Sequence, residues 1–231
     1  MIFRFFPILA GATLRDRLVA CIGALVAITL TGLIAAKAVG AAAALLIVAP
    51  MGASAVLVFA VPASPLAQPW SVIGGNVISA LVGVCVAQLV PIPALAAGLA
   101  VAGAILAMSL SRSLHPPGGA TALMAVIGGP SIAALGFGFA LVPVGVNAVI
   151  LAGIGVLFHR LSGHSYPHVA AVPGAGVAVA TGAAEVSMPH REDIDRALAD
   201  LGETFDVSRE DLDLLLQRAE FHAERRVRGV R

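Results

Sequence analysis

Residues 116–130 read PPGGATALMAVIGGP. The segment is apolar, but it opens on two prolines and closes on two glycines and a third proline. Proline lacks a backbone donor and clashes with the preceding helical turn, so a helix can begin at Pro116 or Pro117 but cannot run through them. A straight spanning helix needs about 20 residues. We therefore expect a short, broken helix at membrane depth, which survives only where protein or a water-filled cavity surrounds it.

A second apolar stretch, residues 41–61, repeats this pattern. Its string PMGASAV at 50–56 aligns with PGGATAL at 117–123, with proline, glycine, a hydroxyl and alanine in register. Each stretch lies between apolar runs long enough to cross a bilayer. We therefore expect an all-α membrane protein of six membrane segments, arranged as two three-segment repeats with one broken helix each. The four long runs are 18–38, 72–90, 93–111 and 132–159.

Charge is distributed very unevenly along the chain. Hydrophobic residues make up 59% of it and charged residues 12%, and no Asp or Glu occurs between Asp16 and Glu185. Carboxylate acid/base catalysis, divalent-metal sites and carboxylate-coupled transport all need an acid there. We therefore expect no catalytic residues, no metal and no cofactor, and a substrate that is neutral or anionic. The fixed cations of this stretch are Arg17, Lys37, Arg112 and Arg160.

The arginines also predict an orientation. Arg4, Arg15 and Arg17 precede the first span, which places the N-terminus in the cytoplasm by the positive-inside rule. Six segments return the chain to the same side, and a three-segment repeat is then inverted. Four full spans with two re-entrant loops remain the alternative; both termini stay inside, but Arg112 moves outside.

The expected organisation has four parts, in the inner membrane of a bacterium with both termini cytoplasmic. The tail should form two helices over 190–226, and its apolar stripe, which includes Leu212, Leu215 and Leu216, should pack on a partner surface such as a second subunit. The parts are an interfacial segment at 1–17, a transmembrane domain at 18–163, a linker at 164–185 and a helical tail at 186–231.

The helix starts after the two breaks are the predicted binding site. The first N–H groups of a helix have no intrahelical acceptor and lie at the positive end of its dipole, so they attract anions. We expect a small anion between Gly52–Ser54 and Gly119–Thr121, held weakly, with Arg112 and His115 near an entrance. The candidate substrate-binding residues are Gly52, Ala53, Ser54, Asn76, Arg112, His115, Gly118, Gly119, Ala120 and Thr121, and the helix breaks are Pro50, Pro116 and Pro117.

Each of these side chains also has a structural interpretation. An arginine at the position of Arg112 is more often a membrane-edge anchor. His115 and Asn76 can each satisfy the broken backbone beside them, and Ser54 and Thr121 can hydrogen-bond within their own helices.

The sequence resembles the HPP family of integral membrane proteins over roughly residues 15–167. The similarity is carried by SRSLHPPGGATAL at 111–123, APMGASAVL at 49–57, SPLAQP at 64–69 and GGN at 74–76. Members in plastids and cyanobacteria are associated with nitrite transport, so the resemblance implies a small-anion substrate, with nitrite first. Bacterial members often add a pair of CBS domains. The tail resembles the helical linker before such a pair, so we expect either a short form of the family or a chain cut before that pair.

Two other functions compete with transport. One is an intramembrane enzyme using His115 with Ser111, Ser113 or Thr121, although no acid is available to orient the histidine. The other is a membrane sensor or scaffold, or a component of a CBS-regulated channel. The expected partners are the lipid bilayer, the anion and further copies of the chain in a homodimer or other homo-oligomer, and no nucleic acid.

Overall fold

The computed structural model describes Leu9 and residues 13–39, 47–169, 191–201, 206–207 and 209–227. Most of the predicted interfacial segment, residues 1–17, and most of the predicted linker, residues 164–185, lie outside these ranges. Residues 16–168 form one compact unit, and the described tail residues belong to another. Every regular element described is a helix.

Four helices of the described chain are long and apolar enough to cross a membrane. They are α1 (Leu14–Val39), α3 (Pro69–Leu89), α4 (Pro93–Leu110) and the span Ala140–Ser162, which contains α7 (Val146–Ser162). The first three agree with the predicted runs at 18–38, 72–90 and 93–111. The all-helical membrane fold is therefore confirmed.

The remaining two segments are half-length helices, as the broken stretches predicted. Helix α2 covers Pro50–Ala60 and α5 covers Pro116–Ile127, 11 and 12 residues respectively. At 1.5 Å per residue they are about 16–18 Å long, roughly half the thickness of the hydrocarbon core. Each begins at its proline, because proline fits the first helical turn, where its missing N–H removes no hydrogen bond. In the part of the chain that the structure describes, four helices are therefore long enough to span a membrane and two segments are half-length.

The last apolar run was predicted to be one helix over 132–159, but the structure divides it. A four-residue helix, α6 (Pro130–Ala133), is followed by the irregular turn η2 (Ala140–Gly145) and then by α7. Val142 has extended backbone angles ahead of Pro143. A residue that precedes proline is driven out of the helical region by the proline ring, which is why the helix starts later than its hydropathy suggests.

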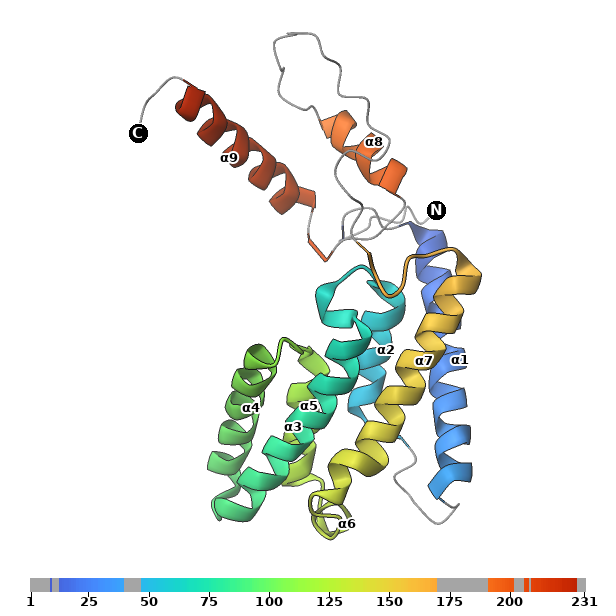
Figure 1. The fold of residues 1–231 in the computed structure, drawn as a ribbon, viewed down its shortest axis with the longest axis vertical. Helices are drawn as coiled ribbons and strands as arrows, with labels where there is room; N and C mark the ends of the chain where they lie inside the picture. The colour runs from blue at the N-terminus through green and yellow to red at the C-terminus, as the bar shows by residue number, and fades with distance from the viewer. Residues whose placement is uncertain are drawn as a thin grey trace, which may run out of the picture. The chain divides into compact units, whose positions relative to one another are not determined.

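Helix α3 lies at the centre of the membrane unit. It packs against α4, α5, α7 and the two short η segments, while α2 packs against α5 and α7. Helices α2 and α5 run in opposite directions beside one another (Figure 1). Small residues permit the close packing: a Cβ on Gly83 would lie 2.5 Å from the carbonyl oxygen of Ala122.

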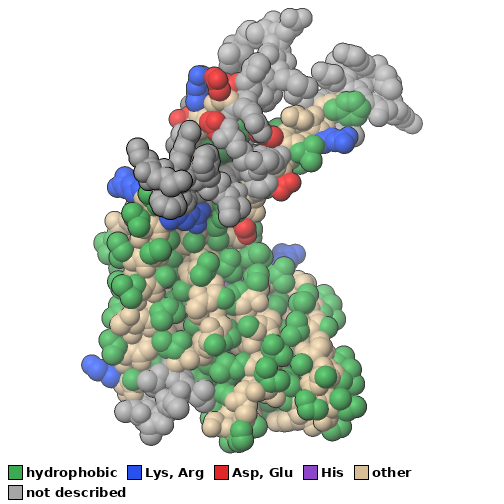
Figure 2. Space-filling view, turned by 180° about the vertical axis from the view of Figure 1, so that it is seen from behind, with side chains coloured by type: hydrophobic (Ala, Val, Ile, Leu, Met, Phe, Trp, Pro, Cys, Tyr) green, Lys and Arg blue, Asp and Glu red, His purple; other side chains and the backbone are tan. Residues whose placement is uncertain are grey.

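Large apolar side chains cover the outside of this unit. Leu25, Leu89 and Leu106 are 69%, 74% and 61% exposed, and apolar side chains dominate the face of the helical bundle drawn in Figure 2. Exposed apolar area on this scale is unusual for a protein in water and is expected for a lipid-facing surface.

The tail forms the two helices that were predicted, α8 (Arg191–Leu201) and α9 (Arg209–Val227). Ile194 and Leu198 of α8 pack with Val207, Leu212 and Leu216. Leu215 does not share this packing and is 64% exposed. The stripe therefore has a partner within the tail itself for Leu212 and Leu216, whereas burial of Leu215 against another surface remains a prediction.

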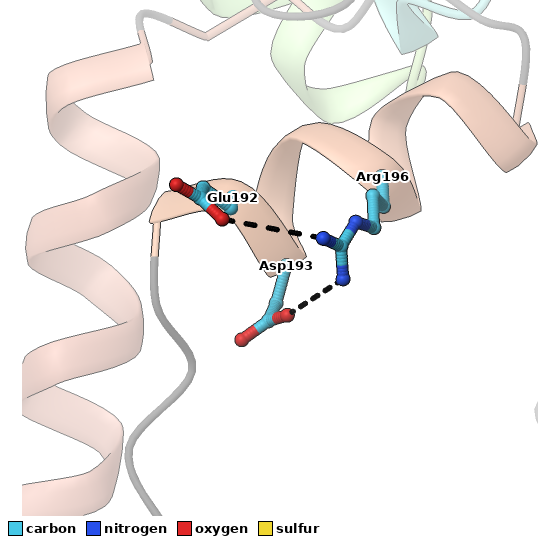
Figure 3. A network of polar contacts seen from close by, with 3 residues as sticks. All are labelled: Glu192, Asp193 and Arg196. Atoms are coloured by element: carbon cyan, nitrogen blue, oxygen red, sulfur yellow. Dashed lines mark ion pairs between the residues drawn. The ribbon is translucent and has the colours of Figure 1, made fainter.

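Charged residues on α8 add little to this pairing. Arg196 lies 4.0 Å from Glu192 and 3.7 Å from Asp193, and all three side chains are exposed (Figure 3). Exposed pairs of this kind contribute about 0–1 kcal/mol, so the apolar contacts carry the pairing.

Replacing Leu216 with aspartate in the full chain should loosen the tail hairpin. The variant places a charge against Ile194 and Leu198, and a loss of about 1.4 kcal/mol corresponds to a tenfold larger open population. Trypsin cleavage within α8 and α9 in detergent should accelerate roughly tenfold. Leu214→Asp, at a 52% exposed position outside this packing, is the matched control and should cleave at the wild-type rate. Equal rates for the two variants would contradict the observed pairing.

Candidate functional site

Four polar side chains meet inside the membrane unit. Ser54 belongs to α2, Asn76 to α3 and Thr121 to α5, and His115 is the residue that precedes α5. Each is 0% exposed. All four were predicted as site residues, and the fold brings them together from positions up to 67 residues apart. We refer to them as the polar cluster.

Asn76 bridges the two half-length helices. Its side-chain NH₂ donates to the Val72 carbonyl at 2.8 Å and to Ser54 Oγ at 3.3 Å, and its Oδ1 accepts from the Thr121 hydroxyl at 2.6 Å. The Val72 carbonyl is only an acceptor, so the amide cannot be turned the other way round. Asn76 thus presents a donor to Ser54 and an acceptor to Thr121.

His115 joins the polar cluster to the connector between α2 and α3. Its Nδ1 lies 2.8 Å from the Leu66 carbonyl oxygen and its Nε2 lies 2.8 Å from Ser54 Oγ. Because a carbonyl only accepts, Nδ1 carries a hydrogen. Ser54 has a second acceptor within reach, the Pro50 carbonyl at 3.2 Å. The hydroxyl hydrogen of Ser54 can therefore be donated to either of two acceptors, His115 Nε2 or the Pro50 carbonyl.

One N–H group that was predicted to lack an acceptor has one. Gly52 N–H donates to Ala49 O at 3.1 Å, and the neighbouring Met51 N–H donates to Val48 O at 2.9 Å. In α5, Gly118 N–H donates to His115 O at 2.8 Å. The residue before each proline turns back and supplies a carbonyl. The buried side chains of the polar cluster, rather than these N–H groups, are therefore the polar groups that distinguish this region.

The glycines of the site fall into two groups. Gly118 is buried, and a Cβ there would lie 2.6 Å from Ser79 Oγ and 2.8 Å from Met108 Sδ, so it serves close helix packing. Gly119 is half-buried, and a Cβ there would meet one atom within 4 Å, at 3.9 Å; at Gly52 it would meet none. These two positions are therefore open, as an approaching ligand requires.

Three further predicted residues lie outside the polar cluster. Ala53 and Ala120 are exposed. Arg112 is exposed in the connector after α4 and has a φ of 54°. Beside it, the Trp70 indole donates to the Ser111 carbonyl at 3.1 Å. The structure thus places Arg112 at the surface of the unit, which fits the membrane-edge interpretation, and its role in binding remains a prediction.

Sequence reasoning missed the way in which the connector between α2 and α3 is held. The Tyr166 hydroxyl donates to Ala67 O at 2.8 Å, Ser71 Oγ to Pro65 O at 2.8 Å, and the Gln68 amide to Pro62 O at 2.9 Å and Ser64 O at 2.8 Å. With the His115 contact to Leu66 O, these bonds fasten the connector from several sides. Burial raises the pKa of Tyr166, which therefore stays a neutral donor.

Asn147 was also missed. It is buried in α7, and its Oδ1 accepts from Val48 N–H at 3.1 Å, just before α2 begins. An asparagine in an apolar stretch beside a broken helix predicts a side chain that satisfies the broken backbone. This signal indicates Asn147 as well as Asn76.

The apolar exterior, the four long helices and the two half-length helices around a buried polar cluster define a helical integral membrane protein. A sequence profile described as the HPP transmembrane region matches residues 10–167. The chain therefore belongs to the HPP family, as the motifs at 111–123 and 49–57 indicated.

Two transmembrane proteins of Dictyostelium discoideum are similar to parts of the chain. One is 46% identical over 101 residues, which is 42% of this chain and 35% of the relative; the other is 48% identical over 77 residues, or 32% and 25%. The chain thus spans about a third or less of these relatives' length. No solved structure matches.

Proposed function

We propose that this protein is a transporter or channel for a small inorganic anion, with nitrite as the first candidate substrate. The observation that carries the proposal is the buried polar cluster, which links two half-length helices inside a membrane unit without Asp or Glu between Asp16 and Glu185. Buried polar groups at membrane depth are expensive and commonly mark a substrate pathway.

The chemistry of the polar cluster favours an anion over a cation. Ser54, Thr121 and Asn76 supply hydroxyl and amide donors, and no carboxylate is present to hold a cation. The N-terminal ends of α2 and α5 add two positive dipole ends, each contributing up to about 2 kcal/mol when partly buried. Binding would turn the Ser54 and Thr121 hydroxyls from protein acceptors to the anion. Together the two helix ends and the hydroxyl donors would give a binding free energy near −4 kcal/mol, which corresponds to millimolar affinity for the anion and allows its ready release.

The transport proposal includes an inverted repeat. Helices α1, α2 and α3 form the first triplet, and α4, α5 and the span Ala140–Ser162 form the second. It is supported by the opposite directions of α2 and α5 and by the shared use of Asn76 by Ser54 and Thr121, which occupy equivalent positions of the repeated strings. An inverted repeat leads to alternating access by one triplet rocking against the other.

The remaining parts of the proposal follow from charge and family. The proposal includes a bacterial inner membrane as the location, both termini in the cytoplasm, and a homodimer or other homo-oligomer as the working form. Transport is proposed rather than catalysis, because no carboxylate contacts His115 within the polar cluster to orient it as a base.

Nitrite flux into proteoliposomes tests the proposal with two variants. Gly119→Val fills an open position beside the start of α5, and Thr121→Val removes the hydroxyl that contacts Asn76. Gly119→Val should abolish flux by steric exclusion. Thr121→Val should lower it about tenfold, since one hydrogen bond contributes about 0.5–1.5 kcal/mol net.

Matched controls exist elsewhere in the membrane unit. Gly98→Val also fills an open position, on α4, and Thr29→Val removes an exposed hydroxyl on α1. Both controls should transport at the wild-type rate. Wild-type flux in folded Gly119→Val and Thr121→Val together would place the pathway elsewhere.

A further inference from the structure

We propose that His115 binds a proton during transport and that one proton accompanies each anion across the membrane. The inference rests on the proposed function and extends it from the identity of the substrate to the source of driving force. It comes from three features of the structure: the two acceptors available to Ser54, the few titratable groups near His115, and the burial of the polar cluster.

The hydrogen bonds around His115 remain complete in both protonation states. In the neutral ring, Nδ1–H donates to Leu66 O, and Nε2 accepts from the Ser54 hydroxyl at 2.8 Å. In the protonated ring, Nε2–H donates to Ser54 Oγ, and the displaced hydroxyl hydrogen turns to Pro50 O at 3.2 Å. Asn76 donates to Ser54 Oγ in either state. The proton can therefore arrive and leave without stranding a buried donor, which would be costly.

The surroundings of His115 leave the proton few other sites. The contacting elements are α2, the connector 61–68, α3 and α5. Across these elements and the 111–115 turn, all within the described chain, the other titratable or charged side chains are Arg112 and Cys85, both exposed. Cys85 lies nine residues beyond Asn76 on α3, about 13 Å along the helix. His115 is thus the titratable group within the polar cluster.

Burial couples the proton to the anion. Every member of the polar cluster is 0% exposed, so a lone imidazolium or a lone anion there is an unpaired buried charge. Together they neutralise each other, and by reciprocity each raises the affinity of the site for the other. The pair NO₂⁻ and H⁺ moves with no net charge and no electron transfer, and His115 Nε2 releases the proton as the anion leaves.

The test measures nitrite and proton movement in the same proteoliposomes at a clamped membrane potential of zero. An inward proton gradient should accumulate nitrite, and an inward nitrite gradient should acidify the lumen with a ratio near one to one. Nitrous acid crosses lipid unaided, so the flux of protein-free vesicles is subtracted. His115→Gln should keep downhill nitrite flux, reduced up to about tenfold, and lose gradient-driven accumulation.

His159→Gln is the matched control. His159 is also buried and bonds Val58 O at 2.8 Å, but it lies outside the polar cluster, so its variant should retain coupling. If wild-type nitrite flux is unaffected by the proton gradient at this clamped potential, the coupling inference is overturned while the proposed function stands. Coupling lost with His159 and kept with His115 also overturns it. No flux above protein-free vesicles overturns the proposed function and the inference together. Should His115→Gln fail to fold, the wild-type stoichiometry alone decides.

Discussion

Replacing Asn76 with aspartate should reduce nitrite flux by roughly 10²–10³-fold. An ionised carboxylate at this position lies in the proposed path of the anion, and two like charges 4 Å apart repel by about 4 kcal/mol at an effective dielectric constant of 20. The change also removes an amide that makes two donor contacts, and it sets an oxygen against the Val72 carbonyl. The measurement is initial nitrite uptake in proteoliposomes, with thermal unfolding in detergent recorded alongside.

Gln88→Glu is the matched control for this prediction. Gln88 is an exposed amide on the same helix as Asn76, so its variant adds the same charge away from the polar cluster. Its flux should stay within about twofold of wild type. An Asn76→Asp protein that folds and still transports nitrite at the wild-type rate would exclude the polar cluster as the pathway.

Replacing Gly83 with alanine should destabilise the membrane unit by about 1–3 kcal/mol, the usual range for overpacking. The added methyl would lie 2.5 Å from Ala122 O, 2.8 Å from Ala125 Cβ and 2.9 Å from Ala122 Cα. Two of these atoms belong to the α5 backbone, so no side-chain rotation relieves the clash and α3 must separate from α5. The apparent melting temperature in detergent should fall by several degrees.

The control for Gly83 is Gly98→Ala on α4, where the new methyl meets no atom within 4 Å. This variant should be neutral or gain up to about 1 kcal/mol, because alanine favours a helix interior over glycine. If both variants melt at the same temperature, the close approach of α3 and α5 is wrong.

The helices could be predicted from the sequence where their bounds depend on nearby prolines and on the hydropathy of the segment itself. Pro50 and Pro116 fixed the starts of α2 and α5, because the consequences of a missing N–H are confined to one turn. The late start of the last span was not predicted, although Pro143 is visible in the sequence. Hydropathy alone does not tell whether an apolar stretch continues as helix through a proline or bends around it.

The four members of the polar cluster were among the residues predicted for the site, but most of their hydrogen bonds were not predicted. The repeated strings placed Ser54 and Thr121 in register, and both contact Asn76. The backbone partners of the polar cluster could not be predicted, because Leu66 O beside His115 and Pro50 O beside Ser54 are carbonyl atoms, and every residue carries one. The same reason explains the error over the N–H group of Gly52, whose acceptor, Ala49 O, is also a backbone atom.

The fastening of the connector between α2 and α3 has a consequence for how mutations are tolerated there. Five carbonyl oxygens of the connector, at Pro62, Ser64, Pro65, Leu66 and Ala67, accept side-chain hydrogen bonds. A carbonyl survives any substitution, proline included, whereas a donor side chain such as Tyr166 or Ser71 does not. Saturation mutagenesis should therefore give an asymmetric map: broad tolerance at Leu66, and intolerance at the distant positions that reach toward the connector. The loop is held in place partly by Gln68 within it and partly by residues outside it.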